Sequence, residues 1–191
     1  MPSSDPSKAN ASGLTPEQSK QLPTRQVRDN EHQIIKSIRE LYSSAPTTST
    51  YEVYAADAVF HDPVGIAKGL HSIRAQFNAL PSLFPRAVIT KFNLLETPKE
   101  VPENTIVIDQ VVDYYRKQQD DKPFKSLNSL LTIRREAEPS GLIKSHTEEW
   151  NHMAETDSSN SGFFGQLNEM RKKAMARLTE GAASQTPPTE R

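Results

Sequence analysis

Three side chains of this 191-residue sequence combine acid/base chemistry with a useful spacing. His146 and Glu148 lie two residues apart, so in a β-strand they project from the same face. Asp62 is the third, and it follows a short stretch that reads as a strand. Burial shifts the pKa values of such groups toward neutrality, so a carboxylate and an imidazole in one cavity could act as base and acid.

Each candidate also has a structural interpretation. His146 and Glu148 form an acid/base dyad, half of a metal site, or a buried pair that orients its strand. A metal would need Asp62 as third ligand with a single imidazole, so we expect neither a metal nor a cofactor. The absence of cysteine excludes thiolate catalysis. Asp62 stands in an Asp-Pro-Val-Gly stretch, where its side chain is either a base or the holder of a turn.

The elements that must position these groups follow from the hydrophobic periodicity, which changes from 3.6 to 2 near residue 87. Consecutive strands with short connections favour an antiparallel meander, and the predicted fold class is α+β. The predicted helices are 24–44, a short one from Ser49 through Tyr54, 69–80 and 162–179; the predicted strands are 59–62, 88–96, 105–116, 125–135 and 142–152, with a loop at 63–68.

Alternation also assigns faces in strand 105–116. Its even-numbered residues are the more apolar set and are expected to face the interior. That set includes Gln110 and Tyr114. The apolar residues Val107, Val111 and Tyr115 remain on the outer face, where we expect a homodimer contact.

The stretch Tyr54–Gly65, followed by Gly69, Ile73 and Phe77, resembles the opening of ketosteroid isomerases and SnoaL-like polyketide cyclases. These families belong to the nuclear transport factor 2-like superfamily, and the resemblance extends more thinly from residue 27 to 150. It implies a cone, in which a curved antiparallel sheet wraps around N-terminal helices. The helix at 162–179 would be an addition to that cone.

The resemblance also implies site residues. Family members carry Ile and Trp at the spacing of Ile143 and Trp150, with the Trp side lining the pocket. That places His146 and Glu148 inside, and Asp62 matches the position of the isomerase base. The predicted catalytic residues are Asp62, His146 and Glu148, and the predicted ligand-binding residues are Phe60, Phe77, Gln110, Tyr114 and Trp150.

The electrophilic half of a steroid isomerase is missing. Counted without gaps, the family's oxyanion-hole tyrosine falls on Ile38, with Tyr42 a full turn away, and its aspartate falls near Ser129. We therefore expect a cone that binds a small, largely apolar molecule, with groups suited to a cofactor-free isomerase, cyclase or dehydratase. The alternative is a non-catalytic binding or assembly module, as nuclear transport factor 2 itself is.

Composition limits the remaining possibilities. Residues 1–23 and 181–191 are rich in Ser, Pro, Thr, Gln and Lys and are expected to be disordered. That leaves one domain at 24–153 and a linker with a helix at 154–180. The net charge is −1, so neither nucleic acid nor an anionic membrane is an expected partner. With no secretion signal, we expect a soluble, cytoplasmic protein. Separately, we expect the histidine at position 152 to be exposed.

Overall fold

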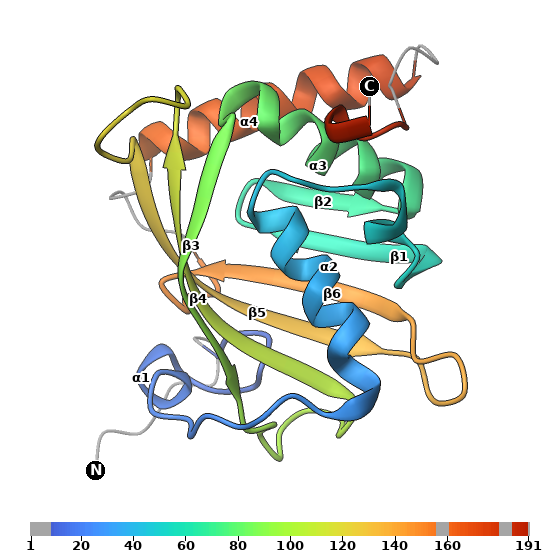
Figure 1. The fold of residues 1–191 in the computed structure, drawn as a ribbon. Coiled ribbons are helices and arrows are strands. Elements are labelled where there is room, and N and C mark those ends of the chain that lie inside the picture. Colours follow the sequence, from blue (N-terminus) through green and yellow to red (C-terminus); the bar gives the residue numbers. More distant parts are fainter. Residues whose placement is uncertain (1–8, 156–160, 180–184, 191) are drawn as a thin grey trace.

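A strongly curved sheet carries the fold in the computed structural model, which describes residues 9–155, 161–179 and 185–190. The six strands lie in the order β2-β1-β6-β5-β4-β3, and α2 and α3 lie against the concave side (Figure 1). The strand bounds are β1 Tyr54–Asp62, β2 Gly65–Lys68, β3 Arg86–Leu95, β4 Thr105–Tyr115, β5 Lys125–Arg135 and β6 Ile143–Trp150. The α+β cone predicted from the sequence is confirmed.

One strand pair departs from the predicted antiparallel sheet. β3, β4, β5 and β6 form the expected antiparallel meander, but β1 pairs with β6 in parallel. Phe60 lies opposite His146 in that pair. Hydrophobic periodicity carries no signal for this contact, because Phe60 and His146 lie far apart in the sequence. The first and last strands of the cone are thereby held side by side.

The first long helix, α2 (His32–Tyr42), is shorter than the predicted span of 24–44. Residues before it run extended, and Thr24 bridges to Leu95 on the edge of β3. A 3-10 turn at Asp29–Glu31 leads into the helix, and Arg25 forms an ion pair with Glu31 at 2.7 Å. The apolar stripe of α2, ending at Tyr42, faces the interior of the cone.

The segment before the first strand also differs from the prediction. The short helix expected from Ser49 is a 3-10 turn, η3 (Thr48–Tyr51), and β1 then begins at Tyr54. β2 replaces the predicted loop, since the chain turns at Gly65 and pairs back on β1. The turn needs a glycine, because Gly65 has φ +151°.

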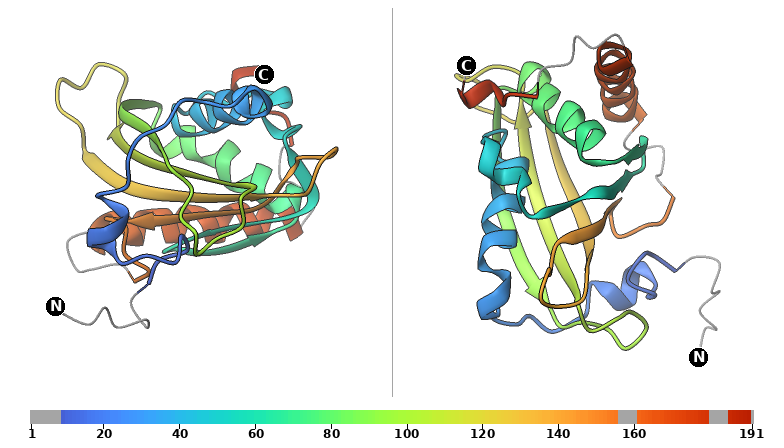
Figure 2. Two further views of the ribbon diagram at one scale, coloured as in Figure 1. Left: turned by 90° about the horizontal axis from the view of Figure 1, so that it is seen from below. Right: turned by 90° about the vertical axis from the view of Figure 1, so that its right-hand side faces the viewer.

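Two helices close the wide end of the cone. α3 (Leu70–Leu83) buries Ile73, Phe77 and Leu80, and α4 (Ser161–Thr179) lies alongside it (Figure 2). Phe163 of α4 belongs to the buried core of the cone. The C-terminal helix therefore docks on the opening of the cone and not on the outer face of the sheet.

The N-terminal segment corrects our expectation of a disordered tail. Residues 9–23 follow a defined course that includes the short helix α1 (Pro16–Ser19), with a capping box between Thr15 and Gln18. Leu22 packs on the outer face of the sheet. It covers a small second core there, formed by Leu95, Val107 and Leu130. Part of the face on which we expected a dimer contact is thus occupied by the chain itself.

The disorder predicted for the C-terminal residues is wrong for 185–190. This segment contains the 3-10 turn η5 (Pro188–Glu190). The backbone N–H of Thr48 donates to the Glu190 carboxylate at 2.7 Å and so ties η5 to the rest of the chain. The rest of both predicted tails, at 1–8, 181–184 and 191, lies outside the described residues, as do 156–160 of the predicted linker. In the described chain no helix has the length and apolar character needed to cross a membrane.

Candidate functional site

A nearly filled cavity of about 30 Å³ lies inside the cone, between the sheet and the two closing helices. Its wall is mostly aromatic and aliphatic. Its polar members are Tyr42 from α2, Asp62 from β1, Gln76 from α3 and Glu148 from β6. The apolar members are Phe60, Val64, Phe77, Leu80, Tyr114, Leu127, Trp150, Phe163, Leu167 and Met170.

Glu148 is a buried carboxylate in this apolar surrounding. Its Oε2 accepts a hydrogen bond of 2.9 Å from the hydroxyl of Tyr42. The side chains of Ser129 and Trp150 also hydrogen-bond to it. Burial and the negative charge of Asp62 nevertheless raise the pKa of Glu148 to about 7. The group can therefore both take and release a proton near neutral pH.

His146 lies behind the wall of the cavity and is fully buried. Its ring packs edge-on to Phe60 at 4.9 Å between centroids and near-parallel to Phe77 at 6.4 Å. Burial lowers its pKa to about 3, so the imidazole is neutral at physiological pH. The lining of the cavity includes its neighbour Glu148 but not His146.

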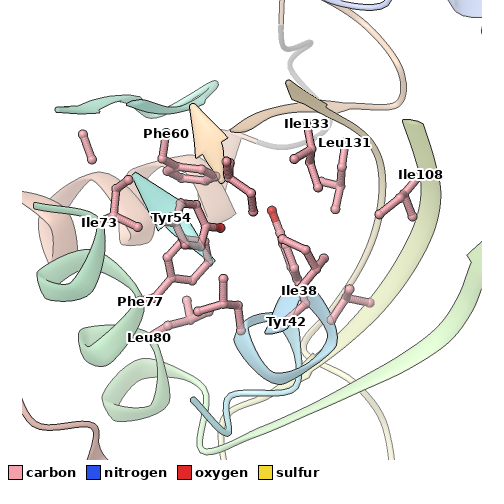
Figure 3. Packing of buried hydrophobic residues seen from close by; sticks show 14 of the residues in the cluster. Ile38, Tyr42, Tyr54, Phe60, Ile73, Phe77, Leu80, Ile108, Leu131 and Ile133 are labelled. Carbon is pink, nitrogen blue, oxygen red and sulfur yellow. The ribbon is translucent and has the colours of Figure 1, made fainter. Parts of the chain in front are cut away.

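A chain of hydrogen bonds connects this histidine to the carboxylate. Nδ1 of His146 lies 2.8 Å from the hydroxyl of Tyr54, and Nε2 lies 3.3 Å from that of Tyr42. Both hydroxyls point into the same interior space (Figure 3). Because Tyr42 donates to Glu148, its oxygen is free to accept from Nε2–H, and Nδ1 then accepts from Tyr54. All the donors in this chain point toward Glu148.

Asp62 holds the turn that follows β1, and its carboxylate also lies on the cavity wall. Its Oδ1 accepts from the backbone N–H groups of Val64 at 3.0 Å and Gly65 at 2.9 Å, as in an Asx turn. Its Oδ2 accepts from Gln76 at 3.1 Å and its carboxylate lines the cavity. Burial raises the pKa of Asp62, although the hydrogen bond from Gly65 and the charge of Arg171 oppose that rise.

The remaining predicted residues separate into two groups. Phe60, Phe77, Tyr114 and Trp150 lie on the cavity wall. Gln110 is fully buried but lies in the strand interior, where its amide donates weakly to Ser129 at 3.4 Å. It therefore supports a neighbour of Glu148 and does not line the cavity.

Sequence reasoning did not find Tyr42, Tyr54 and Gln76 as members of the site. Tyr42 is the last residue of α2 and ends its buried stripe, so helical periodicity places it on the inner face without indicating a role in the site. Alternation along residues 54–62 would have placed Tyr54 on the face of Phe60 and Asp62, but only the end of that segment was expected to be a strand. For Gln76 the signal is helical, since it lies three residues after Ile73 and four before Leu80 on the buried face of α3.

α4 supplies the outer wall of the cavity, which the sequence could not indicate. The ring of Phe163 lies 5.5 Å from that of Trp150 and 5.4 Å from that of Tyr114. Leu167 and Met170 line the cavity from the same helix. The apolar side chains of this helix therefore face the interior of the cone.

A second polar cluster lies outside the cone, between the N-terminal segment and the sheet. His152 bridges Ser19, at 2.9 Å from Nδ1, and Asp109, at 3.2 Å from Nε2. Our expectation of an exposed His152 is wrong, since it is fully buried. Ser19 is equally buried, so this serine, histidine and aspartate hold the N-terminal segment in place and have no access to a substrate. Among the described residues no group of three or more His, Cys, Asp or Glu is placed to hold a metal ion.

Solved structures share this architecture. A steroid delta-isomerase from Pseudomonas aeruginosa superposes with a TM-score of 0.53 at 13% sequence identity, over 83% of this chain and 98% of that one. A protein with a cystatin-like fold from Silicibacter pomeroyi DSS-3 gives a TM-score of 0.51 at 12% identity, over 78% and 90%. No family model and no curated protein matches the sequence. The chain has the cone fold of the ketosteroid isomerase-like and nuclear transport factor 2-like proteins, as the resemblance implied.

Proposed function

We propose that the interior of the cone binds a small, largely apolar organic molecule and that Glu148 transfers a proton on it without a cofactor. Isomerisation, cyclisation and dehydration are the reactions that such a transfer serves. The observation that supports this proposal is the state of Glu148: a carboxylate on an apolar wall, with a pKa of about 7. A base that titrates near the working pH is the most effective kind.

The surrounding residues suit such a transfer. Glu148 takes a proton from the substrate and its carboxylate becomes a neutral acid, which can return the proton at a second position. The hydroxyl of Tyr42 is then released from the carboxylate and can donate to an oxygen of the substrate. Neutral His146 would hold that hydroxyl in place from behind. Asp62 is the second carboxylate on the wall.

Substrate entry requires a movement of α4. A ligand pocket usually has ~300–1,000 Å³, whereas about 30 Å³ is open here. The side chains that occupy the difference at the mouth are Phe163, Leu167 and Met170. A ligand must therefore displace these side chains, and with them the helix that carries them.

The same filling of the cavity favours a second candidate function. If α4 stays in place, the cone is a packed core and the protein is a non-catalytic binding or assembly module. In that case Glu148 and Tyr42 would be a buried pair that specifies the packing of β6 against α2.

A thermal-shift screen with a library of metabolites and lipids distinguishes the two. A ligand at ~100-fold its dissociation constant adds about 2.7 kcal/mol to the free energy of unfolding. The screen is run on the wild type and on Phe163→Ala, which opens the mouth, with Phe124→Ala as the control for loss of a partly exposed aromatic residue outside the cavity. Hits that bind Phe163→Ala more tightly support the cone as a binding site. No hit with either protein contradicts the proposal and favours the module.

A further inference from the structure

The charges that face the cavity are not balanced by the cone itself. Asp62 and Glu148 are the acids on its wall, and His146 behind the wall is neutral. Among the described residues that line the cavity there is no lysine or arginine. The cone without α4 thus presents two carboxylates in an aromatic enclosure, which favours a positive charge inside it.

α4 supplies one cation to this site. Nη1 of Arg171 lies 3.6 Å from Oδ1 of Asp62, and the side chain of Arg171 is only 12% exposed. The guanidinium lies directly on Gly65, where a Cβ would come within 2.5 Å of Nη1. That Nη1 has no hydrogen-bond partner among the described residues. At Nη1 the cation therefore faces Asp62 as an ion pair and packs closely on Gly65.

α4 therefore presents both apolar side chains and one cation to the cone. The apolar side chains are Phe163, Leu167 and Met170, and the cation is Arg171, which lies about one turn beyond Leu167. The aromatic wall against which these side chains pack includes Trp150, Phe60 and Phe77. Faces of such rings attract organic cations through their negative quadrupole.

We propose that the cone binds an apolar organic cation, a protonated or quaternary amine, and that α4 occupies its place when it is absent. The positive nitrogen lies between Asp62 and Glu148, and the apolar part replaces Phe163, Leu167 and Met170. This inference rests on the proposed function, since it names the ligand class of the same cavity. An anionic ligand would meet two carboxylates and is excluded by the same charges.

Three small aromatic probes test the ligand class: phenyltrimethylammonium, its uncharged isostere tert-butylbenzene, and the anion benzoate. Trp150 is the only tryptophan of the chain and lies on the cavity wall, so its fluorescence reports occupancy. We expect phenyltrimethylammonium to bind about tenfold more tightly than tert-butylbenzene, and benzoate not to bind.

Four variants locate the charge. Arg171→Gln removes the competing cation and should raise the affinity ratio of phenyltrimethylammonium to tert-butylbenzene. Glu148→Gln and Asp62→Asn should lower that ratio. Arg177→Gln, on an exposed position of the same helix, is the matched control and should leave the ratio unchanged.

The outcomes separate this inference from the proposed function. Equal or tighter binding of tert-butylbenzene overturns the cation class but leaves an apolar binding site. If the affinity ratio of phenyltrimethylammonium to tert-butylbenzene does not respond to Arg171→Gln, Glu148→Gln or Asp62→Asn, the cation binds elsewhere. That result also overturns the inference. If none of the probes binds the wild type, Arg171→Gln or Phe163→Ala, the cation class fails, and the library screen decides separately whether the cone binds an apolar molecule.

Discussion

Tyr42 and Glu148 lie on opposite walls of the cone and share a hydrogen bond of 2.9 Å, with the tyrosine as donor. One residue ends the first long helix and the other lies near the end of the last strand. The bond fixes which way the protons point in the chain behind it, from Tyr54 through His146 to the carboxylate. Glu148 is therefore the acceptor at the end of this chain of hydrogen bonds.

The first prediction concerns the free-energy cost of burying the Glu148 carboxylate. Its pKa of about 7 lies above the ~4.3 of an unfolded glutamate. The folded protein therefore holds a proton that the unfolded chain releases between these values, and stability falls as pH rises from about 4.5 to 7. Glu148→Gln should remove this loss, so that its stability relative to wild type improves over this range by on the order of 3 kcal/mol. Urea unfolding at a series of pH values measures the effect.

Glu149 is the matched control for this experiment. Burial also raises its pKa to about 7, but its carboxylate lies outside the cone and accepts from the backbone N–H of Ala11 at 2.8 Å. Glu149→Gln should reduce the pH dependence of stability in the same direction without changing ligand binding. A pH profile of Glu148→Gln that coincides with wild type would show that Glu148 is not the buried acid described here.

The second prediction separates the two tyrosines on either side of His146. Tyr42→Phe removes a donor to Glu148, so the pKa of Glu148 should rise further, with a loss of stability of about 1 kcal/mol. Tyr54→Phe removes only the donor to Nδ1 of His146 and should leave the pKa of Glu148 where it is. Carbon-13 NMR titration of the Glu148 carboxyl measures both. Equal shifts in the two variants would contradict the directed chain.

Much of the fold could be predicted because periodicity reports local burial. The four long strands and the helix ending near residue 80 are confirmed within a few residues. The contacts that periodicity could not give are those between distant segments: the parallel pairing of Phe60 with His146, and Leu22 on the outer face. The Ser and Pro content of residues 9–23 predicted disorder, yet Asn10 and Ser19 are buried against His152.

The site was only partly accessible from the sequence, for a related reason. Glu148 and Trp150 were placed inside by the resemblance, and strand alternation then carried His146 to the same face. Whether a residue on the inner face reaches the cavity depends on what stands in front of it. His146 is screened by Phe60 and Phe77, and no one-dimensional pattern contains that information.

The third prediction tests the homodimer that we expected at the outer face of the sheet. Leu22 covers Val107 and Leu130 there, so deletion of residues 1–22 should expose them and increase self-association. Light scattering over a range of concentrations compares this variant with the full chain. Deletion of residues 1–8 is the control, because it keeps the contacts of Asn10 and Ala11. Monomer masses for all three proteins would exclude this face as a dimer contact.

The last prediction concerns Asp62, whose charge and acceptor atoms do different things. Asp62→Asn keeps an oxygen for the N–H groups of Val64 and Gly65. Its new amide can donate to Oε1 of Gln76, which has no partner among the described residues. Because burial raises the pKa of Asp62, loss of its charge should leave stability unchanged or raise it.

Asp62→Ala removes the acceptor as well and should cost about 1–2 kcal/mol. The charge, in contrast, should matter for α4, because Arg171 loses its partner in both variants. Hydrogen exchange of the α4 amides should then be faster in both variants, whereas only Asp62→Ala lowers the unfolding midpoint. If Asp62→Asn is as unstable as Asp62→Ala, the ionised carboxylate itself holds the turn, and Asp62 is a structural residue with no charge to offer a ligand.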